Sequence, residues 1–154
     1  MGIVSGTPED NLDAVWTCAL GFFKDKKVPD RFRNLKLSMF TQAAKPWDAF
    51  PRLKGKAAEV KTFGAALMHV FESKMNRAEV HHRQILLLLK MGVRLEQIMV
   101  EQREAIKFAA PVADEFFRCA IAYAQLASAL ARRYNLLGIR MFDITIKMHY
   151  LVHG

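Results

Sequence analysis

The sequence has few of the features that mark a secreted or disulfide-stabilised domain. It holds two cysteines, Cys18 and Cys119, in 154 residues. Each lies in an apolar pattern with helical spacing, which favours two buried, reduced thiols over the alternative of one disulfide. The absence of a Cys-x-x-Cys pair excludes the common zinc and redox motifs built on that spacing. The cysteine content is therefore typical of an intracellular protein.

Signals for export or membrane attachment are also missing. The first residues contain no basic segment followed by an apolar one, as a signal peptide would. They differ from the myristoylation pattern because Gly6 stands where Ser or Thr is required. The longest strongly apolar run, Ile85–Leu89, ends at Lys90 and is far shorter than the roughly 18 residues of a membrane span. We expect no membrane partner, and a location in the nucleus or cytoplasm.

Motifs for enzymatic chemistry are scarce. Neither the Gly-x-Ser-x-Gly nucleophile motif nor the phosphate-binding Gly-x-x-x-x-Gly-Lys motif occurs. His149 and His153 are four residues apart, as in two-histidine metal pairs, and are the weak candidates for a metal site. We predict no catalytic residue and no cofactor. A metal-dependent helical enzyme remains the third alternative.

Positive charge, in contrast, is abundant and unevenly placed. The net charge is +8, and residues 24–61 contain eleven Lys or Arg against four acids. An anionic partner such as nucleic acid explains this excess, and a solvated surface that keeps the protein soluble is the alternative. Trp47 and Phe50 would either stack on unpaired bases or seal the segment onto a helical core. The predicted nucleic-acid-binding residues are Arg31, Arg33, Lys36, Arg52, Lys54, Lys56 and Lys61.

Apolar residues recur at spacings of three and four through most of the chain, which predicts an all-α fold. We expect an irregular bundle of four to six helices in a single domain, 1–154. A long central hairpin of helices 57–75 and 77–107 would pack against helix 112–137, because the connection between the first two is short. The tail 1–6 should be loose and the basic segment 28–56 irregular.

Shorter helices are predicted elsewhere along the chain. A helix should begin at Pro8, capped by Thr7, and end near Lys27. A short helix is expected over 34–44 and a last one over 146–153. Because that last helix ends in an apolar pattern, the chain is expected to be truncated at its C-terminus. Extra apolar surface on the helices favours a second interpretation, a structural or oligomerisation unit that binds a homo-oligomer partner or a neighbouring protein segment.

Four elements between residues 53 and 153 give the chain a resemblance to a known family. They are the Lys-Ala-x-Glu opening of Lys56–Glu59, the His- and Leu-rich His81–Leu89, the aromatic-rich Phe116–Tyr134, and Thr145–His153 with its two histidines. Together they resemble the helical region of Kyakuja–Dileera–Zisupton-type eukaryotic transposases. The resemblance implies a transposase-derived helical module. It carries over no catalytic acid, and Val60 and Phe63–Gly64 depart from the bulkier aromatic runs of the family.

These features favour a non-catalytic helical module that binds nucleic acid or protein through its basic segment. The purely structural or oligomerisation unit is the alternative to it. This expectation depends on the uneven distribution of positive charge, most of which lies in the basic segment.

Overall fold

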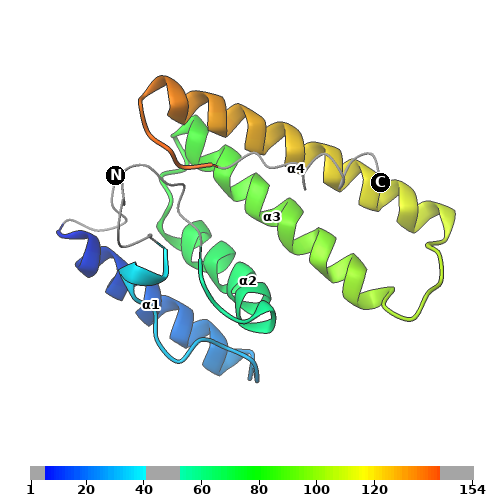
Figure 1. Cartoon of the computed structure of the whole chain (residues 1–154), viewed down its shortest axis with the longest axis horizontal. Helices are drawn as coiled ribbons and strands as arrows, with labels where there is room; N and C mark the ends of the chain where they lie inside the picture. The colour runs from blue at the N-terminus through cyan, green and yellow to red at the C-terminus, as the bar shows by residue number, and fades with distance from the viewer. Residues whose placement is uncertain (1–5, 41–52, 143–154) are drawn as a thin grey trace. The chain divides into compact units, whose positions relative to one another are not determined.

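The computed structural model describes residues 6–40 and 53–142 (Figure 1). Within these ranges it contains four α-helices, a single 3-10 turn and no strand, so the predicted all-α class is confirmed. The chain divides into two compact units, Met1–His82 and Arg83–Gly154, and each is described by itself. Among the described residues, no helix has the length and apolar character needed to cross a membrane.

Helix α1 (Pro8–Asp25) has well-defined signals at both ends. The Thr7 hydroxyl accepts from the Asp10 backbone N–H at 3.2 Å, and the Asp10 carboxylate accepts from the Thr7 backbone N–H at 2.7 Å. This reciprocal pair is a capping box. The backbone N–H and the hydroxyl of Thr7 both donate to the Asp10 carboxylate, which lowers the pKa of Asp10. At the other end of the helix, Lys27 has a φ of 51°. The Lys27 N–H donates to the Lys24 carbonyl, and the Val28 N–H donates to the Phe23 carbonyl.

The end of α1 leads to a prediction, because a lysine occupies the left-handed position that favours glycine. Lys27→Gly is expected to stabilise unit 1 by about 1 kcal/mol, since the Cβ strain at positive φ disappears. Thermal and denaturant unfolding measure the change. Lys26→Gly is the matched control: it removes the same charge at a φ of −87°, where glycine should only destabilise. Equal changes in stability at positions 26 and 27 would contradict the left-handed conformation of Lys27.

The core of unit 1 lies between α1 and α2 (Ala57–Lys74), next to the short 3-10 helix η1 (Leu37–Met39). Aromatic rings fill much of it: Phe23 meets Trp16 and Phe22 edge-on, and Phe32 meets Phe63 edge-on. Edge-to-face pairs of this kind add to the stabilisation gained from burial. The buried members are Ala19, Phe23, Phe32, Leu35, Phe63, Ala66 and Val70.

Unit 2 is built on α3 (Val80–Glu101), from Arg83 onward, and α4 (Ala110–Leu136), which lie antiparallel (Figure 1). Leu88, Ala127 and Leu130 form a buried cluster in this unit. The Tyr123 ring covers Gly92 so closely that a Cβ there would lie 3.3 Å from the ring. A mid-helix glycine costs about 1 kcal/mol of helix propensity, and here the close crossing explains its presence. Burial raises the pKa of Tyr123.

An arginine links the two helices of unit 2. The Arg94 guanidinium donates to both Glu115 oxygens, at 2.7 and 3.0 Å, and also to Glu101. This two-bond geometry is the strong form of an arginine–carboxylate pair. The Arg94 side chain holds the pKa of Glu115 below its ordinary value of 4.5.

Acid should therefore weaken unit 2 through Glu115. A carboxyl whose pKa is lowered by folding stabilises the fold above its unfolded-state pKa and loses that contribution as pH falls through the folded-state pKa. Glu115→Gln should lower the melting temperature at pH 7, and the difference from wild type should shrink as pH falls below 4.5. Glu104→Gln, which removes an exposed pair with Arg103, should change little at any pH. A difference that does not vary with pH would contradict the Arg94–Glu115 assignment.

The helix ends compare closely with the sequence predictions, with a few differences. The start of α1 is confirmed, and α4 ends at Leu136, within one residue of the predicted end, with Gly138 at a φ of 71° after it. Helix α3 is shorter than the predicted 77–107 and continuous through Gly92. The Asn76 side chain accepts from the Ala78 N–H and delays the start of α3, and turns at 102–105 end it early.

The expected pairing of helices 57–75 and 77–107 is not confirmed. Helix α2 belongs to unit 1 and packs on α1, whereas most of α3 belongs to unit 2 and packs on α4. Of the short helix predicted over 34–44, only Leu37–Met39 is helical among the described residues. The predicted helix over 146–153 lies outside the described residues. Cys18 and Cys119 are both free thiols, as expected, but each is partly buried and not buried as predicted.

Candidate nucleic-acid interface

Two basic stretches of unit 1, separated in sequence, meet in the fold. One is Arg31–Phe32–Arg33 and the other Lys54–Gly55–Lys56. They meet at Phe32 and Gly55: a Cβ added to Gly55 would overlap the edge of the Phe32 ring, lying 2.5 Å from its Cζ atom. The four cations of the two stretches are direct chain neighbours of Phe32 or Gly55. Each Cα atom therefore lies about 3.8 Å from the Cα atom of one of these two residues. We call Arg31, Arg33, Lys54 and Lys56 the basic cluster.

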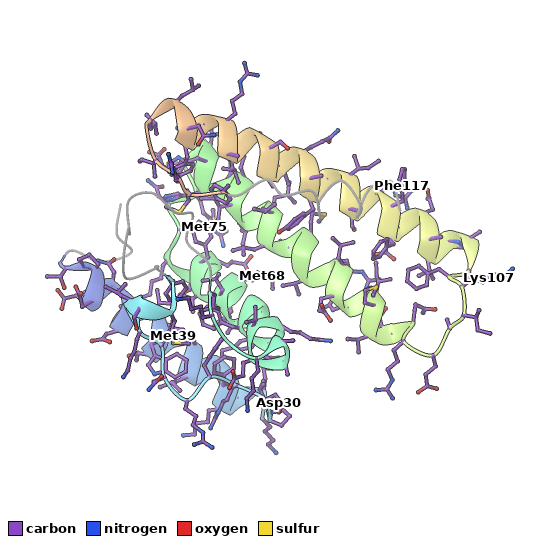
Figure 2. The ribbon with its side chains drawn as sticks, in the orientation of Figure 1. Asp30, Met39, Met68, Met75, Lys107 and Phe117 are labelled. Atoms are coloured by element: carbon purple, nitrogen blue, oxygen red, sulfur yellow. The ribbon has the colours of Figure 1, made fainter. Side chains whose placement is uncertain are left out.

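Neighbouring contacts fix the backbone on both sides of Gly55. The Lys54 N–H donates to the Met39 carbonyl at 2.8 Å, which ties the second stretch to η1; Figure 2 labels Met39. The Lys56 N–H donates to the Glu59 carboxylate at 2.9 Å at the start of α2. Lys36 directly precedes η1, and its backbone N–H donates to the Met39 sulfur. A fifth cation is therefore linked to the residue that also accepts from Lys54. The second stretch is therefore held by a hydrogen bond at each of its two cations.

The charges of the cluster are open to solvent. Arg31, Arg33, Lys36, Lys54 and Lys56 are exposed, and within the part of the chain that the structure describes none of these five forms an ion pair with another residue. Unit 2 differs, because three of its arginines, Arg94, Arg103 and Arg118, pair with carboxylates. The two acids nearest in sequence to the cluster are Asp30, labelled in Figure 2, and Glu59. These five cations are therefore not compensated by ion pairs within the described residues, in contrast to those three arginines.

The aromatic side chains next to these cations point into the protein. Phe32, between two arginines, is only 4% exposed and packs on Phe63. Phe40 packs against the same core. The Phe32 ring therefore cannot stack on a base without leaving the core, whereas Phe40 is partly buried. Trp47 and Phe50, for which stacking was the open alternative, lie outside the described residues.

The remaining predicted site residues fall into two groups. Lys61 is exposed on α2 and has a partner of its own. Arg52, His149 and His153 lie outside the described residues. In residues 6–40 and 53–142 there is no group of three or more His, Cys, Asp or Glu that could hold a metal ion. The sequence contains a Glu-x-x-His element, Glu79 to His82, and the imidazole of that histidine accepts a hydrogen bond from the Asn76 N–H.

What sequence reasoning missed is the contact that assembles the cluster. Neither Phe32 nor Gly55 stands out in the sequence pattern. The available signal was the repeated order of cation, non-polar residue, cation in both stretches. This order places a non-polar residue between two cations in each stretch, but it does not say that Phe32 and Gly55 meet.

Comparisons with known proteins do not assign a function to the basic cluster. Comparison of the chain with protein-family models, with curated proteins and with solved structures finds no match. Chemically, the basic cluster offers a set of exposed, charged N–H donors. Donors of this kind suit a bound anion.

Proposed function

We propose that this chain is a non-catalytic helical module that binds nucleic acid through its phosphates, using the basic cluster of unit 1. The observation that supports the proposal most is the contact of Phe32 with Gly55, which gathers four exposed cations from stretches far apart in sequence. A transposase-derived origin is part of the proposal, and it is supported only by the four sequence elements named above.

The chemistry of the cluster favours phosphates over bases. Arginine forks bind phosphate oxygens with two bonds, and lysine binds them as a point charge. Contacts of this kind fix a protein on nucleic acid without reading its sequence. Because Phe32 is buried in the core, base stacking adds nothing from its ring. We therefore expect weak dependence on sequence and no preference for single strands.

A salt series tests the proposal. The protein is titrated into a labelled mixed-sequence duplex, and separately into the matching single strand, from low to physiological ionic strength. With four phosphate contacts, log affinity should fall against log salt with a slope of about −3.6 for the duplex and about −2.8 for the single strand. Absence of binding at low salt, or binding that salt does not change, would overturn the proposal.

A second candidate function, an oligomerisation unit, is supported by the apolar surface of unit 2. Ile106, Phe117 and Leu136 are exposed, and Leu136 retains 82% of its accessible surface. Large exposed apolar residues of this kind often mark a protein contact when they form a patch. Sedimentation equilibrium over a wide concentration range tests this alternative, and a monomer at every concentration would contradict it.

A further inference from the structure

The glycine of the second basic stretch has an unusual environment among the described glycines. Gly6 and Gly138 have positive φ angles of 135° and 71°, so their backbone conformation accounts for them. Gly55 has no such angle, and its backbone suits other residues. What it lacks is space, because the Phe32 ring occupies the position of a Cβ.

From this we infer that Gly55 and Phe32 are positioning residues of the nucleic-acid surface: their contact sets the spacing of the basic cluster, and binding depends on that spacing as well as on charge. The inference rests on the proposed function and adds to it how the site is assembled. It separates a built phosphate-binding site from a merely basic segment, which would bind in proportion to its charge alone.

The physical basis is that the ring cannot easily give way. Phe32 is buried, and Phe63 on α2 packs against it with ring centroids 5.8 Å apart. A side chain at position 55 would therefore push its own stretch outward, against the hydrogen bond from Lys54 to Met39. Lys54 and Lys56 would move away from Arg31 and Arg33, although no charge would change. Fewer cations would then reach neighbouring phosphates together.

The test compares one chemical change at three glycines of unit 1. Gly55→Ala adds a methyl group that overlaps the Phe32 ring, whereas Gly21→Ala and Gly64→Ala add it where nothing lies within 4 Å. We expect Gly55→Ala to bind the duplex more weakly at every salt concentration and to reduce the salt slope by about 1 to 2, the loss of one or two phosphate contacts. The two control variants should keep the wild-type slope.

A compensating pair separates spacing from a general loss of folding. Phe32→Leu removes the ring atoms that Gly55 approaches, so this variant alone should also show a reduced slope because the stretch loses its support. In the double variant F32L/G55A the added methyl group has room, and a slope near that of wild type is expected. Circular dichroism identifies any variant that does not fold. If Gly55→Ala does not fold, a steeper slope for the double variant than for Phe32→Leu supports the inference.

The outcomes distinguish this inference from the proposed function. If the wild-type protein does not bind at low salt, the proposed function fails and the inference fails with it. If the wild-type protein binds with a steep slope, but Phe32→Leu and every folded variant with alanine at position 55 share that slope, only the inference is overturned. The surface would then act through its net charge.

Discussion

Neutralising the basic cluster should remove most of the salt dependence of binding. The variant R31Q/R33Q/K54Q/K56Q loses four exposed cations, and the slope of log affinity against log salt for duplex DNA should become shallower by about 3.6. The four side chains make no ion pair within the described residues, so their replacement should cost little stability. Fluorescence anisotropy across the salt series measures the slope, and thermal unfolding checks the fold.

A matched control removes the same number of charges elsewhere. The variant K107Q/R118Q/R132Q/R133Q replaces four exposed cations of unit 2 and lowers the net charge equally. It should reduce affinity slightly through long-range electrostatics and leave the slope nearly unchanged. If the two quadruple variants lose equal slope, binding follows net charge and the cluster is not a site.

Truncating Phe23 should have the largest effect on stability. Its side chain has no exposed surface and contacts the rings of Trp16 and Phe22. Phe23→Ala is expected to destabilise unit 1 by about 3–5 kcal/mol, through lost apolar burial and the cavity left behind. Because Phe32 belongs to the same core, binding should also decline at temperatures where unit 1 of this variant is unfolded.

Leu20→Ala provides the comparison on the same helix. Leu20 is 40% exposed, so less apolar area is lost and the neighbours can adjust. Its cost in urea unfolding should be within about 1 kcal/mol. Equal costs at positions 20 and 23 would mean that Phe23 does not lie in the core as described.

Local signals predicted the helices well because they act between residues close in sequence. Thr7 and Asp10 cap α1 through side-chain chemistry that the sequence displays directly, and Gly138 closes α4 in the left-handed conformation that glycine tolerates. The pairing of helices was harder. Periodicity identifies the apolar face of α2 but not the element that covers it, which is α1 with the segment around Phe32.

The candidate site shows the same division. The types of its residues were evident, since the charge of residues 24–61 is a property of composition. Its assembly was not evident, because Phe32 and Gly55 are distant in sequence and glycine has no side chain whose pattern reports a neighbour. Only the folded structure shows that the Phe32 ring occupies the space where a side chain at position 55 would lie.

Mapping the bound nucleic acid on the protein by amide chemical shifts tests the central claim most directly. A labelled sample of the 154-residue chain is titrated with a short duplex at low salt, and the shifts are assigned along the chain. The account predicts that the largest changes fall on residues 31–36 and 54–56, and that added salt reverses them together. Changes concentrated on α4, around Arg132 and Arg133, or no changes at all, would contradict it.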